Sequence, residues 1–154
     1  MELHIIRTVP VHGEMVHQIT DATIRSVYPK YYPCGAVAFF LAHHCMENIL
    51  RDITEHKVFL LYDPDKKPVG TVTIKENEIC RLFVLPVHQG KGYGRVLLDY
   101  AESMIAARYR SVILDASLPA KGIYRKRGYV SVDYHEIVTQ CGDVLCYDVM
   151  QKNL

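Results

Sequence analysis

The segment Ile79–Gly94, with the sequence ICRLFVLPVHQGKGYG, determines how the rest of the chain is interpreted. The apolar run Ile79–Leu85 predicts a strand, and three closely spaced glycines, Gly90, Gly92 and Gly94, come just before a helical pattern. Glycine lets a backbone approach a ligand closely, and the free amides of a first helical turn point at whatever binds there. Because the helix dipole adds to those amides, the segment predicts a site for a phosphate or pyrophosphate group.

The glycine spacing excludes one common phosphate-binding loop and leaves another open. A P-loop requires Gly-Lys-Ser/Thr, which does not occur here. A dinucleotide-binding turn requires G-x-G-x-x-G directly after the strand, whereas Pro86–Gln89 intervene and Arg95 stands where the last glycine would be. In favour of that turn, Asp115 ends the next predicted strand about 20 residues on, where a ribose-binding acid would lie. A plain strand-to-helix turn without a ligand is the third interpretation.

Composition narrows the class of protein without naming a function. The 154 residues correspond to one domain, residues 1–154. A net charge of +1 and a hydrophobic content of 49% are globular values, and they lack the basic excess that bulk nucleic-acid binding needs. No apolar run reaches the ~18 residues of a membrane span, and no signal peptide is recognisable. We therefore expect a cytoplasmic protein with no nucleic-acid partner and no membrane partner.

The five cysteines do not form a recognisable framework. Their number is odd, and the closest pair, Cys141 and Cys146, has four residues between its members. A zinc site usually contains pairs separated by about two residues, and small disulfide-rich domains usually contain an even number of cysteines. We expect free thiols in a reducing compartment and no metal site.

Apolar periodicity outside the glycine segment predicts a mixed α/β chain. Strand patterns occur at Leu3–Val9, Lys57–Tyr62, Val69–Lys75, Ile79–Leu85, Ser111–Asp115, Tyr129–Val138 and Val144–Met150. Helical patterns occur at Glu14–Tyr28, Gly35–Ile53, the segment from Gly94 that includes Ile105, and Pro119–Arg127. This order predicts an α/β (α+β) fold with one central, partly antiparallel sheet. If Val144–Met150 is an edge strand, it could pair between subunits, so we expect a monomer or a homodimer.

Three motifs in this order resemble those of the GNAT N-acetyltransferase superfamily. Gln89–Gly94 matches the acetyl-CoA signature [QR]-x-x-G-x-[GA] of that family, and Leu82–Pro86 resembles its L-x-V-x-P strand end. Downstream, Tyr124–Tyr129 is similar to its Y-x-x-x-G-[FY] ending. The resemblance is close over about Glu78–Tyr129. It implies the GNAT acyl-CoA N-acyltransferase fold, in which a mostly antiparallel sheet contains one splayed parallel pair and is flanked by helices.

The resemblance also implies how acetyl-CoA would bind, between the strands Ile79–Leu85 and Ser111–Asp115. Backbone groups of Phe83 and Val84 would pair with the pantetheine arm, and the Val84 amide would polarise the thioester carbonyl. Ser117 stands near the position where the family often has an asparagine that contacts this arm. The pyrophosphate would be held by the amides of Gln89, Gly90, Lys91, Gly92, Tyr93, Gly94 and Arg95.

The implied reaction is direct attack of an amine on the thioester, which needs a general base and a proton donor for the departing sulfur. Tyr124 stands at the family's acid position, and a tyrosine with a pKa of about 10 stays protonated at neutral pH. Glu78, six residues before Val84, stands where some relatives have their general base. By pKa alone, His43, His44 and His88 are alternatives to Glu78.

The remaining expectations concern the acceptor and the rival functions. His44 shares a helical face with apolar residues, so we expect a core histidine whose hydrogen bonds are satisfied. The basic run from Lys121 to Arg127 is expected to be a solvated helix face that could meet the adenosine 3′-phosphate. We expect an N-acetyltransferase acting on a primary amine of a small molecule or peptide. The alternatives are a non-catalytic acyl-CoA-binding module and a dinucleotide-binding domain. The weak candidates for acceptor contacts are Tyr31, Tyr32, Phe39 and His43.

Overall fold

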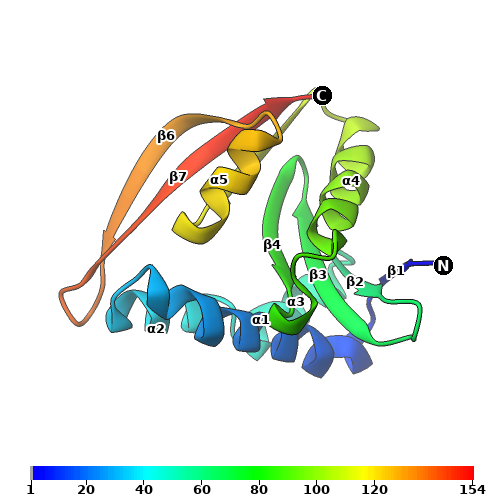
Figure 1. Cartoon of the computed structure of the whole chain (residues 1–154), viewed down its shortest axis with the longest axis horizontal. Helices are drawn as coiled ribbons and strands as arrows, with labels where there is room; N and C mark the ends of the chain where they lie inside the picture. The colour runs from blue at the N-terminus through cyan, green and yellow to red at the C-terminus, as the bar shows by residue number, and fades with distance from the viewer. Residues whose placement is uncertain (1) are drawn as a thin grey trace.

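Seven strands hydrogen-bond into one sheet in the order β1-β2-β3-β4-β5-β7-β6. The computed structural model describes residues 2–154 (Figure 1). The strands are β1 (His4–Arg7), β2 (Val58–Tyr62), β3 (Pro68–Lys75), β4 (Glu78–Val84), β5 (Ser111–Ala116), β6 (Val130–Val138) and β7 (Val144–Asn153). The helices are α1 (Gly13–Val27), α2 (Cys34–His43), α3 (Met46–Thr54), α4 (Tyr93–Ala106) and α5 (Leu118–Lys126), with 3-10 turns η1 (Pro10–His12), η2 (Tyr28–Lys30) and η3 (Pro86–His88).

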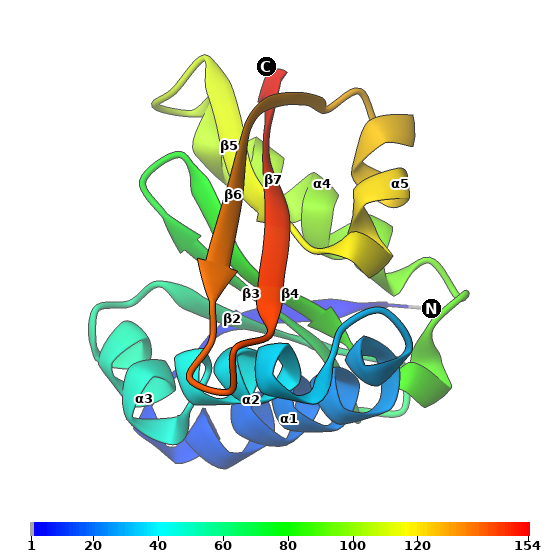
Figure 2. The same cartoon turned by 90° about the vertical axis from the view of Figure 1, so that its left-hand side faces the viewer.

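The helices cover both faces of the sheet and form two apolar cores. Helices α1, α2 and α3 pack on one face, where Ile19, Ile49 and Leu60 are buried (Figure 2). Helices α4 and α5 pack on the other face, where Leu97 and Tyr124 are buried. All strand pairs are antiparallel except β4 with β5. The α/β class with a partly antiparallel central sheet is therefore confirmed.

The single helix predicted over Gly35–Ile53 is wrong, because the chain breaks at His44 and Cys45. Cys45 is extended, with φ −68° and ψ 164°, and a new helix, α3, begins at Met46. His44 leaves the helical stripe because its side chain turns inward and accepts a hydrogen bond from Arg81. The apolar periodicity continues across the break, which is why the pattern predicts one helix.

The predicted edge strand is also wrong. The segment Val144–Met150 lies in β7, which pairs antiparallel with β5 on one side and with β6 on the other. The β6–β7 hairpin reverses the chain so that the later strand enters the sheet and the earlier one, β6, becomes its edge. The other edge is β1.

The turn of the β6–β7 hairpin is attached to the start of α2. Asp143 Oδ2 accepts a hydrogen bond of 2.7 Å from the Gly35 amide, one of the amides that a helix leaves without an internal partner. The hairpin turn therefore lies against α2 in both ribbon views, and the two elements face β4 across the middle of the molecule (Figures 1 and 2).

Strands β4 and β5 are paired over only two residues, Glu78↔Ile113 and Ile79↔Leu114. Directly after these pairs, β4 has a bulge: Ile79 pairs with Ile74 and Arg81 with Thr73, so Cys80 has no partner on β3. A bulge bends and twists its strand. The separation of the two parallel strands therefore begins at Cys80, and the central part of the sheet opens there (Figure 1).

On the α4 side, one buried carboxylate joins three parts of the fold. Glu102 Oε1 accepts hydrogen bonds from Tyr129 Oη (3.0 Å) and Lys152 Nζ (2.9 Å). Its Oε2 accepts a hydrogen bond of 2.8 Å from Arg127 Nε. Burial raises the pKa of Glu102, but the hydrogen bonds from Arg127 and Lys152 outweigh that effect and hold the pKa below its usual range.

We predict that Glu102→Gln loses about 1–3 kcal/mol of unfolding free energy at about pH 7, because three donors lose their charged acceptor. Since the pKa is lowered in the folded state, this stabilisation is present above the ordinary pKa of 4.5 and is lost as the pH falls through the folded-state value. Urea unfolding from about pH 7 to about pH 3 should show the difference from wild type shrinking. A difference that stays constant over this range would contradict the prediction. Glu47→Gln, an exposed change on α3, is the control.

Candidate active site

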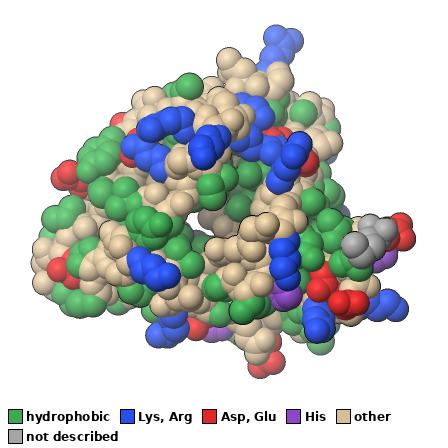
Figure 3. Space-filling model, in the orientation of Figure 1, with side chains coloured by type: hydrophobic (Ala, Val, Ile, Leu, Met, Phe, Trp, Pro, Cys, Tyr) green, Lys and Arg blue, Asp and Glu red, His purple; other side chains and the backbone are tan. Residues whose placement is uncertain are grey.

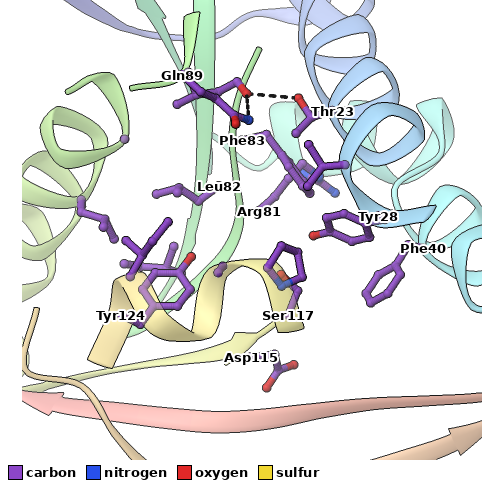
Figure 4. A pocket seen from close by; sticks show the side chains of 18 of the residues that line it. Thr23, Tyr28, Phe40, Arg81, Leu82, Phe83, Gln89, Asp115, Ser117 and Tyr124 are labelled. Carbon is purple, nitrogen blue, oxygen red and sulfur yellow. Dashed lines mark hydrogen bonds between the residues drawn. The ribbon is translucent and has the colours of Figure 1, made fainter. Parts of the chain in front are cut away.

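A cavity of about 880 Å³ occupies the opening between β4 and β5. It reaches from the glycine segment, at the start of α4, past the first turn of α5 to the end of α2. The space-filling view shows a deep hollow at the centre of this face (Figure 3). In the close-up, Gln89 and Asp115 lie at opposite ends of the cavity, with Leu82 and Tyr124 between them (Figure 4).

The glycine segment presents unpaired backbone amides to one end of this cavity. Gly90 and Gly92 have φ values of +76° and +89°, which only glycine adopts without strain, and a Cβ at either position would meet nothing within 4 Å. Helix α4 begins directly after Gly92, and no side chain caps its first turn. The first amides of α4 therefore have no partner within the helix and no side-chain cap from the described residues, and such amides suit a phosphate group. Six of the seven predicted residues, Gln89, Gly90, Gly92, Tyr93, Gly94 and Arg95, line the cavity, whereas Lys91 does not. The prediction that the Gln89 amide binds phosphate is wrong, because this amide donates to the Pro86 carbonyl at 3.2 Å.

The open edge of β4 contributes further backbone groups. The Leu85 amide donates to the Val69 carbonyl (2.9 Å), and in an antiparallel pair such bonds occur at every second residue. The backbone groups of Phe83 and Arg81 are therefore turned toward β3, and those of Leu82 and Val84 face the cavity. The ligand pairing predicted for Phe83 is thus wrong for its backbone, although its side chain lines the cavity. Sequence analysis did not name Leu82, although the alternating direction of backbone groups along the strand could have indicated it.

The carbonyl of Val84 is already occupied, which leaves only its amide free. Gln89 Nε2 donates to this oxygen at 3.0 Å, and Thr23 Oγ1 lies 3.3 Å from it (Figure 4). Val84 therefore acts toward the cavity as a hydrogen-bond donor. A donor fixed at that point suits an oxygen on which negative charge develops.

We predict that Gly92→Ala weakens binding of acetyl-CoA by about 10-fold or more, because alanine strains the positive φ and displaces the first amides of α4. Titration calorimetry with acetyl-CoA measures the change. Gly122→Ala is the matched control: it lies within α5, outside the cavity, and its Cβ would meet nothing within 4 Å. Equal affinities for the two variants would show that the conformation of Gly92 is not needed.

Tyr124 lies in α5 and its hydroxyl points into the cavity (Figure 4). Its ring is 6% exposed and packs edge-on against Tyr129, with the ring centroids 5.5 Å apart. Within residues 2–154, no side chain or backbone group forms a hydrogen bond with the Tyr124 hydroxyl. Burial, and then the nearby Tyr28, raise the pKa of Tyr124. This tyrosine therefore remains protonated at neutral pH and has a hydrogen to donate.

Tyr28 and Ser117 form the wall beside Tyr124. Tyr28 is 7% exposed, and burial raises its pKa, while the nearby Ser117 hydroxyl lowers it by a smaller amount. Both residues line the cavity. Tyr28 was missed because its sequence context, directly before a proline, is that of a helix end.

The four weak acceptor candidates separate into two pairs. Phe39 and His43 line the cavity at the end of α2, with their rings stacked at 6.2 Å. Tyr31 is 52% exposed, and neither it nor Tyr32 lines the cavity. Instead, the Tyr32 hydroxyl accepts a hydrogen bond from the Leu118 amide (2.7 Å) and donates to the Cys146 carbonyl (3.3 Å). It therefore joins the start of α5 to β7.

Two carboxylates lie at the far end of the cavity, of which only Asp115 lines it. Glu78, the predicted general base, begins β4 and pairs with Ile113, outside the lining. Burial, and then the charge of Asp115, raise the pKa of Glu78. Burial also raises the pKa of Asp115, and no side chain within residues 2–154 forms an ion pair with it.

Behind β4, a buried arginine is held by three side chains that sequence analysis did not connect. Arg81 donates to Asp52 Oδ2 (3.2 Å), Thr73 Oγ1 (2.9 Å) and His44 Nδ1 (3.2 Å). His44 is buried, as expected, but only its Nδ1 has a partner among residues 2–154, so the expectation that its hydrogen bonds are satisfied holds for that nitrogen alone. An arginine in an otherwise apolar strand is the signal that a buried acid must lie opposite.

Only part of the basic run is a solvated helix face. Arg125 and Lys126 are exposed, but Lys121 pairs with Asp148 at 2.9 Å and Arg127 pairs with Asp99 and Glu102. Lys126 and Arg127 both line the cavity.

Three further observations concern the cysteines, possible metal sites and membrane-spanning helices. All five cysteines are free thiols. Within residues 2–154, no three His, Cys, Asp or Glu side chains are grouped so that they could hold a metal ion. No helix of the described chain is both long and apolar enough to cross a membrane.

Comparison with known proteins identifies the class of this chain, whose sheet opens at a parallel pair with a glycine segment at the opening. Residues 27–144 match the family model described as "Acetyltransferase (GNAT) domain". The chain therefore belongs to the GNAT acetyltransferase family, as the three motifs predicted. No curated protein matches the sequence.

Solved structures share the fold at low sequence identity. A GCN5-related N-acetyltransferase from Rhodopseudomonas palustris has a TM-score of 0.90 and 22% identity, covering 100% of this chain and 97% of that one. The PaiA N-acetyltransferase from Thermoplasma acidophilum, in complex with coenzyme A, has a TM-score of 0.76 and 18% identity, covering 100% of both chains. YncA from Salmonella typhimurium, a putative acetyltransferase with its cofactor acetyl-CoA, has a TM-score of 0.67 and 14% identity, covering 100% and 95%. At these identities the similarity establishes the GNAT fold.

Proposed function

We propose that this chain is an acetyl-CoA-dependent N-acetyltransferase that transfers an acetyl group directly to a primary amine of a small molecule or peptide. One observation carries the proposal: a single cavity is lined by the uncapped start of α4, by Val84 and by Tyr124, whose hydroxyl points into it. Family membership and the two relatives whose names include coenzyme A or acetyl-CoA support the same conclusion.

The residues present fit acetyl-CoA. The amides from Gly90 to Arg95 would hold its pyrophosphate, because no side chain of the described residues caps the first turn of α4, whereas the Gln89 amide is already bonded to the Pro86 carbonyl. The backbone of Leu82 and Val84 would pair with the pantetheine arm along the open edge of β4. Lys126 also lines the cavity and would supply a positive charge to a phosphate. When bound, acetyl-CoA supplies the acyl thioester.

In the transfer step, the amine nitrogen bonds to the carbonyl carbon and the bond from that carbon to sulfur breaks. The Val84 amide stabilises the developing negative charge on the carbonyl oxygen. Tyr124 gives its hydroxyl hydrogen to the departing sulfur, since its raised pKa keeps it protonated. The proton released by the attacking amine goes to a carboxylate. Glu78 takes it through water, and its raised pKa brings it closer to the pH at which a base works well.

We predict that Tyr124→Phe lowers kcat by about 100-fold, because the leaving sulfur loses its proton donor. The affinity for acetyl-CoA should change by less than about 3-fold, since the ring remains in place. Release of the CoA thiol measures kcat, and calorimetry measures binding. Tyr109→Phe, in the loop after α4 and outside the cavity, is the control. If Tyr124→Phe retained full turnover at every pH, Tyr124 would not be the acid.

The second candidate function is a non-catalytic acyl-CoA-binding module, which the position of Glu78 outside the cavity lining favours. Both candidates bind acetyl-CoA, so calorimetry with acetyl-CoA and NAD comes first: binding of NAD alone would overturn both of them. A panel of primary amines then separates the two. We expect thiol release with at least one amine, and binding of acetyl-CoA without thiol release from any amine would favour the module.

A further inference from the structure

Among the histidines that line the cavity, His44 is the one whose tautomer can be deduced from a neighbouring side chain. Its side chain is 9% exposed, and its ring packs edge-on against Phe83 with the centroids 5.5 Å apart. Arg81 Nε lies 3.2 Å from His44 Nδ1. A guanidinium can only donate, so Nδ1 must be the accepting nitrogen and the ring hydrogen must be on Nε2.

The Nε2–H group is left without a protein acceptor among residues 2–154, on a residue that lines the cavity. Burial, the charge of Arg81 and the neighbouring His43 and Lys75 lower the pKa of His44 to about 3. The ring is therefore neutral at physiological pH. It is a fixed donor and is unsuited to act as the general base.

The charges behind His44 favour an anion in front of it. Arg81 and Lys75 share a single carboxylate, Asp52, at 3.2 and 3.0 Å. The charges of Arg81 and Lys75 both lower the pKa of His44, so the electrostatic field at the ring favours a negative group in front of it. The bond from Arg81 polarises His44 and makes its Nε2–H a stronger donor.

Negatively charged carboxylates lie at the same end of the cavity. Asp115 lines it without an ion-pair partner, and Glu78 lies close enough for the charge of Asp115 to raise its pKa. His43 also lines this region, where the charges of Arg81 and Asp115 act on its pKa in opposite directions. The aromatic side chains of Tyr28, Phe39 and Phe83 form the walls. An acceptor with both an amine and an acidic group would match this distribution, whereas a plain amine would leave the His44 donor unpaired.

We propose that the acceptor is an amine that also carries a carboxylate, as an amino acid does, and that His44 Nε2–H binds this carboxylate. The inference rests on the proposed N-acetyltransferase function and names the substrate class of that site. His44 is a specificity-determining residue in this scheme. The amine lies on the Asp115 side, where its proton is removed.

Two substitutions of His44 distinguish the role of its Nε2–H donor from the role of its hydrogen bond with Arg81. In His44→Asn, the amide oxygen can take the place of Nδ1 and accept from Arg81, but no group remains at Nε2. In His44→Gln, the longer side chain can place an amide donor near the position of Nε2. His56→Asn is the matched control, because His56 is exposed, lies outside the cavity and has a positive φ of +62° that asparagine tolerates.

The substrates are amino acids, each compared with its own carboxamide and with the decarboxylated amine. We expect kcat/KM in the wild type to be about 10- to 100-fold higher for the acid than for the two neutral analogues. His44→Asn should remove this ratio with little change for the neutral analogues, His44→Gln should retain part of it, and His56→Asn should leave it intact. A wild-type ratio near one, or a ratio that His44→Asn leaves unchanged, would overturn the inference while leaving the proposed function standing.

A second readout does not depend on turnover. Nitrogen NMR of the labelled histidine rings, with the His44 signals assigned by their loss in His44→Asn, should show the Nε2–H form between about pH 5 and pH 8. Addition of an N-acetylated amino acid should shift the Nε2 signal, and the N-acetylated decarboxylated amine should not. A titrating His44, or equal shifts with both compounds, would overturn the inference. Absence of thiol release from every amine would instead count against the proposed function.

Discussion

The early separation of β4 from β5 is the constraint on which the rest of the site depends. Two parallel strands in one sheet normally continue side by side and satisfy each other's backbone groups. Here they part after two residue pairs, at the unpaired Cys80 of β4. The buried Arg81 that follows is held by Asp52, Thr73 and His44, so the bent strand is fixed from behind. The backbone of Leu82 and Val84 is left for a ligand, and the cavity exists because the strands part.

Sequence analysis predicted the parts of this site that depend on local chemistry. Gly90 and Gly92 are needed where the chain turns with positive φ, and a strand before them and a helix after them are visible as periodic patterns. The seven strands, their order along the chain and the position of Tyr124 in a short helix follow from the same kind of signal. These features are encoded within a few residues of one another.

The features that were missed depend on contacts between distant segments. The break between α2 and α3 exists because His44 turns toward Arg81, which lies 37 residues away. Which strand forms the edge depends on the direction of the β6–β7 hairpin, and Tyr32 is structural because its hydroxyl reaches Leu118 and Cys146. The bulge at Cys80 appears only when β4 is aligned with β3. No local sequence pattern indicates such pairings. Apolar periodicity indicates which face of an element is buried, but it does not indicate which other element covers that face.

The bond between Asp143 and the Gly35 amide joins segments that are 108 residues apart in the chain, the turn of the β6–β7 hairpin and the start of α2. Both elements carry residues that line the cavity, Ile137, Leu145 and Tyr147 on the hairpin and Phe39, Phe40 and His43 on α2. One hydrogen bond therefore couples two walls of the cavity, and a displacement of the hairpin turn would also displace α2.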